Sequence, residues 1–62
     1  MSQKVRDIIQ ASGGDIGRIT IVPLSSFCVV GAHDESGAVI ASRVMVPAEK
    51  EALEMMLGGR VS

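Results

Sequence analysis

Phe27 is the only aromatic residue with which this chain of 62 residues can build a hydrophobic core. The other apolar side chains are smaller, and each buries less area than an aromatic ring does. A chain near 60 residues also buries only about 60% of the surface that its unfolded form exposes, so its margin of stability is small. Yet 47% of the residues are apolar. The sequence therefore indicates a folded domain that gains from further burial, and a second copy of the chain is the simplest source of it.

The composition excludes several classes of protein. With a formal net charge of −1 and 21% charged residues, the chain is too apolar and too weakly charged for a disordered protein. No apolar run approaches the roughly 18 residues of a membrane helix. A single cysteine cannot form an internal disulfide, and the first residues lack the basic-then-apolar order of a signal peptide. We therefore expect one domain over residues 1–62, cytoplasmic and without contact to a membrane.

Two segments have the features of helices. Residues 3–11 place apolar side chains at helical spacing, and Gly13 favours the left-handed conformation that ends a helix. Pro47 stands where the first turn of a helix accepts proline, and residues 48–57 follow with acidic side chains near the helix N-terminus. The sequence thus predicts one helix at each end of the domain.

Three β-strands are predicted between these helices. Residues 18–23 are rich in β-branched side chains and end at a proline, which cannot donate to a strand ladder. Residues 27–32 are apolar on both faces, and residues 33–37 have the composition and length of a hairpin turn. Residues 38–46 form the third strand, in which one face is expected to hold Val39, Ala41, Arg43 and Met45. The fold class is therefore α+β, a helix followed by a three-stranded antiparallel meander and a second helix (αβββα).

The last two predicted strands carry apolar side chains on both faces. Two helices of about ten residues cover one face of such a sheet and leave the other open, and soluble monomers seldom leave an apolar patch bare. We therefore expect a dimer that forms through the sheet. On the second helix, Met55 and Met56 differ in direction by about 100°, so one of them faces away from the sheet, toward either solvent or a partner. The residues expected at protein interfaces are Phe27, Val29, Val39, Met45, Met55 and Met56.

Nucleophilic catalysis would require His33, the only histidine, to meet a nucleophile, and Cys28, the only thiol, is one candidate. Cys28 lies in an apolar run, where a free cysteine usually serves as a small buried hydrophobe. His33 opens an acidic turn and could act as a base on Cys28 or on the serines at 25 and 26, with Asp34 to orient it. Successive residues of a strand point to opposite sides, however, so closeness in sequence is weak support. We expect no catalytic residue.

Metal and cofactor sites are not expected either. The acidic turn lacks the Cys-x-x-Cys, His-x-x-x-His and calcium-loop spacings of metal sites. Residues 13–18 are rich in glycine, but a dinucleotide-binding loop follows a strand and opens a helix, and here that order is reversed.

Nucleic-acid binding is the alternative function. The basic residues are spread along the chain instead of forming a stripe with aromatic platforms. Phosphate contacts would come from Lys4, Arg6, Arg18 and Arg43.

Two short segments resemble parts of nucleic-acid-binding families. Residues 15–21 (Asp-Ile-Gly-Arg-Ile-Thr-Ile), with residues 26–29 (Ser-Phe-Cys-Val), resemble the second and third strands of the RNA-binding domain that ends some DEAD-box helicases. That domain continues into a helix where residues 38–46 here predict a strand. Residues 43–53 resemble the strand and first helix of ribbon-helix-helix repressors, whose second helix would lie beyond residue 62. Each resemblance covers part of a domain and departs where that fold would need completing, so we adopt neither.

The missing catalytic, cofactor and metal motifs and the surplus of apolar surface favour a function in protein binding. We expect a small intracellular, non-catalytic module that acts as a homodimer and binds a larger protein as its regulator, adaptor or inhibitor.

Overall fold

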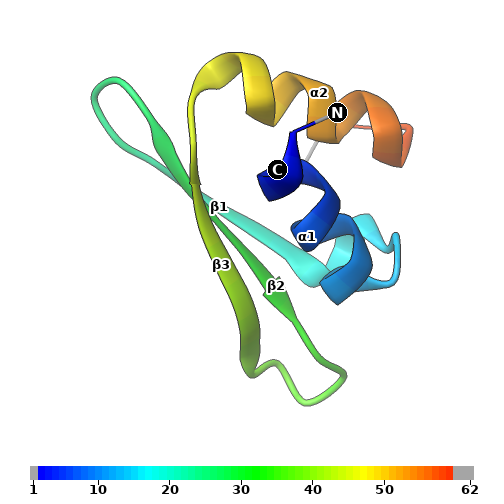
Figure 1. Cartoon of the computed structure of the whole chain (residues 1–62). Coiled ribbons are helices and arrows are strands. Elements are labelled where there is room, and N and C mark those ends of the chain that lie inside the picture. Colours follow the sequence, from blue (N-terminus) through cyan, green and yellow to red (C-terminus); the bar gives the residue numbers. More distant parts are fainter. Residues whose placement is uncertain (1, 60–62) are drawn as a thin grey trace.

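A computed structural model describes residues 2–59 of the chain (Figure 1). Its elements, in order, are α1 (Gln3–Ser12), the short 3-10 helix η1 (Ile16–Arg18), β1 (Ile19–Pro23), β2 (Cys28–His33), β3 (Val39–Met45) and α2 (Pro47–Leu57). The strands form one antiparallel sheet in the order β1-β2-β3. The predicted αβββα meander is confirmed, and η1 is the element that the sequence analysis did not predict.

Local residues explain where the helices begin and end. The Ser2 hydroxyl accepts a hydrogen bond from the Val5 amide at 3.2 Å, which caps the first turn of α1. Pro47 opens α2, where a free amide would have no partner inside the helix. Gly13 and Gly58 end the two helices with φ of 66° and 78°, a left-handed conformation that glycine adopts without steric cost.

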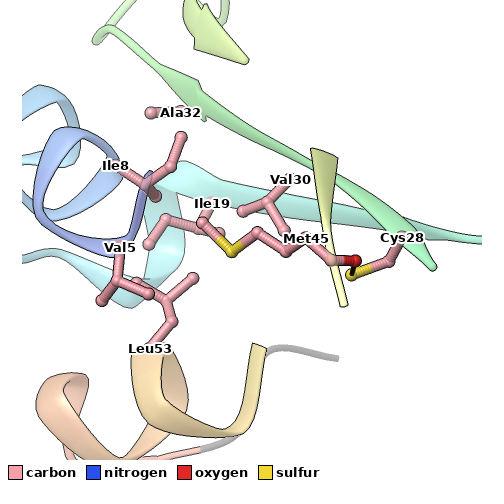
Figure 2. Close-up of a cluster of buried hydrophobic side chains, with 8 residues drawn as sticks. All are labelled: Val5, Ile8, Ile19, Cys28, Val30, Ala32, Met45 and Leu53. Atoms are coloured by element: carbon pink, nitrogen blue, oxygen red, sulfur yellow. Dashed lines mark hydrogen bonds between the residues drawn. The ribbon is translucent and has the colours of Figure 1, made fainter. Parts of the chain in front are cut away.

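Both helices lie on the same side of the sheet (Figure 1). Helix α1 packs against β2 and β3, and α2 packs against α1 and β3. Figure 2 shows the core between these layers, where side chains of both helices meet one face of the sheet. Its buried members are Val5, Ile8, Ile19, Cys28, Val30, Ala32, Met45 and Leu53. This small core, without an aromatic ring, holds the two layers together.

The central strand shows how the two faces of the sheet differ. In β2, Cys28, Val30 and Ala32 are buried toward the helices, and the residues between them are only partly buried. Those alternate residues, Val29 and His33 among them, point to the opposite side of the sheet. Both helices pack on the face that carries Cys28, Val30 and Ala32. Within residues 2–59, nothing covers the face that carries Val29 and His33, so this face is open.

A β-bulge changes the predicted alternation of β3. Ala32 pairs with Ala41, but the next residue, His33, pairs with Val39, so Ile40 is an extra residue in β3. Ala41 therefore faces the helices, whereas Val39 lies opposite His33 on the open side. The prediction that Val39 shares a face with Ala41 was wrong because the inserted residue shifts the alternation by one position.

Candidate functional site

The candidate site is the side of the sheet that the helices do not cover. We call it the open face and define it by eight residues: Thr20, Val22, Val29, Gly31, His33, Val39, Ser42 and Val44. The strand register places them in rows across the sheet. One row is Val22, Val29 and Val44, the next is Thr20, Gly31 and Ser42, and the third pairs His33 with Val39. We call the first of these the valine row.

The open face combines four valines and Gly31 with the polar residues Thr20, His33 and Ser42, and none of its eight residues is a carboxylate, lysine or arginine. Val22, Val39 and Val44 have exposed fractions of 52%, 59% and 49%. About half of the surface of each of these residues is thus in contact with water. Val22 and Val44 flank Val29 on the neighbouring strands, so these three valines form an apolar row across the sheet.

A shallow hollow lies in the open face beside the valine row. Its volume is about 160 Å³, and it is lined by Thr20, Val22, Val29, Gly31, His33, Val39 and Ser42. Gly31 occupies the middle of the central row and has no side chain to fill the space. A Cβ atom at Gly31 would meet the Val39 Cγ1 atom at 3.8 Å and the Ala41 carbonyl oxygen at 3.9 Å, which are ordinary contacts. The fold of one chain therefore has room for a side chain at this position, and glycine there keeps the hollow open.

His33 closes one end of the hollow and is hydrogen-bonded at both ring nitrogens. Its Nε2 atom lies within hydrogen-bond distance of the Thr20 hydroxyl, and its Nδ1 atom lies 3.2 Å from the Gly37 carbonyl oxygen. A carbonyl oxygen only accepts, so Nδ1 carries a proton and donates to Gly37. In the neutral ring, Nε2 then accepts from the Thr20 hydroxyl. Neutral His33 is satisfied within its own chain and needs no water.

Asp34 serves the turn between β2 and β3 and does not orient His33. Its Oδ1 atom accepts hydrogen bonds from the Ser36 hydroxyl at 2.6 Å and from the amides of Ser36 and Ala38 at 2.9 and 3.0 Å. The hydroxyl and these amides hold the pKa of the Asp34 carboxyl below its usual range, because they stabilise the ionised form. The carboxylate thereby fixes the hairpin that carries His33.

The structure does not bring together the residues considered for catalysis. Cys28 and His33 lie at opposite ends of β2 and on opposite faces of the sheet. The buried Cys28 thiol donates to the Met45 carbonyl oxygen at 3.5 Å, as the dashed line in Figure 2 shows. The serines at 25 and 26 precede Cys28 at the far end of β2 from His33. His33 therefore lies close neither to Cys28 nor to the serines at 25 and 26.

Burial of Cys28 leads to a chemical prediction. We expect its thiol to react with a maleimide or an aromatic disulfide reagent far more slowly in the folded protein than in denaturant, because its exposed fraction is 5%. The labelling rate, followed by mass spectrometry with and without urea, measures the difference. Equal rates would show that Cys28 is accessible and contradict its place in the core.

The six predicted interface residues separate into three groups. Val29 and Val39 belong to the open face. Met55 and Met56 are exposed on α2, at 83% and 57%, in the helical layer on the other side of the sheet. Phe27, at 37%, precedes β2.

The sixth residue, Met45, is corrected by the structure. Its exposed fraction is 0%, because it pairs with Cys28 on the side of the sheet that faces the helices. In the fold described, its side chain belongs to the core and is not available to a partner.

The sequence analysis missed Thr20, Val22, Gly31, Ser42 and Val44 as members of one surface. Strand alternation predicts which residues of one strand share a face with Val22 or with Val44, but not which faces of different strands coincide. Only the pairing register shows that both lie beside Val29.

Two of the four cations considered for nucleic-acid binding are paired with carboxylates. Arg18 lies 3.2 Å from Glu35 and 3.8 Å from Asp15. Arg43 lies 3.3 Å from Asp7.

The Arg43 pairing also affects the carboxylate. Hydrogen bonds from Gln3 and Arg43 lower the pKa of the Asp7 carboxyl, so Arg43 faces an ionised partner. Lys4 and Arg6 are exposed on α1. The four cations therefore do not form an unneutralised stripe.

Comparison of the chain with protein families, with curated proteins and with solved structures gave no match. In the part of the chain that the structure describes, no three His, Cys, Asp or Glu side chains gather closely enough to hold a metal ion. No helix there is long and apolar enough to cross a membrane. The argument about function therefore starts from the open face.

Proposed function

We propose that the chain is a non-catalytic protein-binding module that forms a homodimer through its open face. The observation that carries the proposal is the valine row, which crosses all three strands with two of its members half exposed. Removing apolar surface from water is favourable by roughly 25 cal/mol per Å². The core of one chain is small, so this additional burial is a large fraction of what the fold can gain.

The absence of charge on the open face favours a second copy as the occupant. A partner with a charged surface would have to bury its charges against valine side chains, which is costly without an opposite charge. Two open faces bury no formal charge when they meet. In a twofold arrangement, each residue of one copy contacts a residue of the other in a reciprocal manner.

The shape of the open face also fits a second copy. The valine row lies directly beside the row that contains Gly31. A twofold axis between these rows places the valine row of each copy over the hollow of the other. Sheets that pack face to face lie about 10 Å apart with interdigitated side chains. In this arrangement, the open face supplies both the valine row and the hollow over which the valine row of the other copy lies.

The size of the open face limits the surface that the proposed dimer can bury. A standard protein interface buries about 800 Å² on each partner, about a fifth of the 3876 Å² that the chain exposes. By strand spacing and residue rise, a three-stranded face of this length projects roughly 300 Å². The interface is therefore below the standard size, and we expect a reversible dimer of modest affinity.

Sedimentation equilibrium tests the proposal. We expect the mass at pH 7.0 to rise with concentration, between about 1 µM and 1 mM, toward twice the monomer mass of 6.5 kDa. A mass that stays at the monomer value throughout this range would overturn the proposal.

Gly31→Ala gives a prediction in which stability and association change in opposite directions. Glycine within a strand costs about 0.5–1 kcal/mol relative to alanine, and a Cβ atom has room here, so the free energy of unfolding of the monomer should rise by about that amount. The new methyl group partly fills the hollow, so the dimer should weaken. Urea unfolding of dilute protein measures the first effect and sedimentation the second. A variant with unchanged or stronger association would contradict the proposed seating of the valine row.

The proposed dimer leaves Met55 and Met56 of α2 uncovered. Methionine side chains adapt to irregular partner surfaces. We assign the contact with a larger protein partner to these residues, in keeping with a regulator, adaptor or inhibitor. If a larger protein binds, Met55→Lys should weaken that binding without changing the dimer.

A further inference from the structure

The hairpin between β1 and β2 continues the open face beyond the valine row. The last pair of these two strands is Pro23 with Cys28. The Leu24 amide donates to the Phe27 carbonyl oxygen at 2.8 Å, so Leu24 and Phe27 form the next pair along the hairpin. Because Cys28 is buried toward the helices, strand alternation directs this next pair to the open side of the sheet.

Val46 extends this pair to a row across three strands. Its neighbour Met45 pairs with Cys28 and is buried toward the helices. Val46 keeps an extended backbone, with φ of −81° and ψ of 161°, so its side chain points to the opposite side, next to Phe27. We call Leu24, Phe27 and Val46 the tip row.

The tip row is apolar and uncovered. Its three residues are exposed and lie outside the buried core. The hairpin that carries two of them projects away from both helices (Figure 1). The four residues at its end, 24–27, carry no charge. Removal of the tip row from water is therefore favourable and requires no charge to be buried.

We propose that the tip row of each copy packs on the row of His33 and Val39 in the other copy, as the outer part of the homodimer interface. This inference rests on the proposed function, because it concerns the same face and the same partner, a second copy of the chain. Successive rows lie two residues, or about 7 Å, apart along β2. A twofold axis that places the valine row over the row of Gly31 therefore also places the next row outward, the tip row, over the row at the other end of the face.

The area of the interface supports a second copy as the occupant. Three rows project roughly 300 Å², well below the about 800 Å² that each partner buries in a standard interface. By strand spacing and residue rise, the tip row adds roughly 100 Å² on each copy, an increase of about a third. It also brings in Phe27, the only aromatic residue of the chain, and aromatic side chains are enriched in interfaces. Without the tip row, the row of His33 and Val39 would stay uncovered in the dimer.

Sedimentation equilibrium of Phe27→Lys at pH 7.0 tests whether the tip row belongs to the interface. Position 27 is exposed in a single chain, so the lysine reaches water and the monomer should stay folded, which circular dichroism checks. In the dimer, two such ammonium groups would be buried, and we expect the dissociation constant to rise at least about tenfold. Ser25→Lys is the matched control, because it adds the same charge to the hairpin outside the tip row, and it should not weaken the dimer.

Mixed variants test which rows meet. Phe27→Lys and Val39→Glu should each weaken the dimer when alone. In a mixture of the two, the lysine of one copy would lie against the glutamate of the other. We therefore expect the average mass of the mixture to exceed that of either variant alone at the same total concentration. A mixture of Phe27→Lys with Val39→Lys brings like charges together and should show no such gain.

Three results would overturn this inference and leave the proposed function in place. They are a folded Phe27→Lys chain that dimerises like the wild type, a Ser25→Lys chain that is weakened as much as Phe27→Lys, and a mixture with Val39→Glu that gains no mass. If Phe27→Lys does not fold, Leu24→Lys replaces it with the same expected results, because Leu24 is exposed in the same row. A wild-type chain that is monomeric at pH 7.0 would overturn both the inference and the proposed function.

Discussion

Replacing Leu53 with alanine is expected to unfold most of the protein at room temperature. Leu53 is the buried residue of α2, with an exposed fraction of 0%, and its side chain points toward Val5 of α1 in the core (Figure 2). Truncation of a buried leucine costs about 2–5 kcal/mol, including the cavity that remains. The core of a domain this small supplies no more than about 3–5 kcal/mol of net stability. One substitution therefore removes most or all of the margin.

Met56→Ala is the control for this prediction. It lies on the same helix with an exposed fraction of 57%, so we expect a change within about 0.5 kcal/mol. Thermal unfolding by circular dichroism compares both variants with the wild type. A Leu53→Ala protein that melts like the wild type would show that α2 does not pack on α1 and β3 as described.

Val44→Lys is expected to abolish the dimer and to leave the monomer folded. Val44 lies opposite Val29 in the valine row and is 49% exposed, so a lysine there reaches water in a single chain. In the proposed dimer, the ammonium group would be buried against valine side chains, and symmetry would place two of them in the interface. Burying such unpaired charges costs several kcal/mol, so the dissociation constant should rise by about 100-fold or more.

Met55→Lys is the matched control, because it makes the same chemical change at a residue of α2 that is 83% exposed. We expect its sedimentation to match that of the wild type. If Met55→Lys dissociates the dimer while Val44→Lys does not, the copies meet through the helical layer and the proposed interface is wrong.

The order of elements could be predicted from the sequence because its signals are local. Gly13 and Gly58 end helices through their own backbone conformation, and Pro47 starts α2 for a reason that involves only its own nitrogen. The turn before β3 is held by Asp34 through neighbours two and four residues away. Features of this kind need no information about the rest of the fold.

The composition of the open face could not be predicted because it depends on pairing between strands. A single extra residue, Ile40, moves Val39 to the open side, and no local feature of the sequence marks that bulge. Met45 was assigned to an interface from its apolar character, but whether an apolar strand residue meets helices or solvent is decided by the side on which the helices pack. The hollow at Gly31 likewise exists only through its neighbours on β1 and β3.

The central claim is that the open faces of two copies meet, and mixed-label NMR tests it most directly. A sample at pH 7.0 would combine chains carrying carbon-13-labelled valine methyl groups with unlabelled chains, and filtered spectra would record contacts between copies alone. The account predicts contacts from the methyl groups of Val22, Val29 and Val44 to the protons of Gly31 and its row in the other copy. Spectra of a dimer without contacts from these valines, or with contacts from Met55 and Met56 instead, would contradict it.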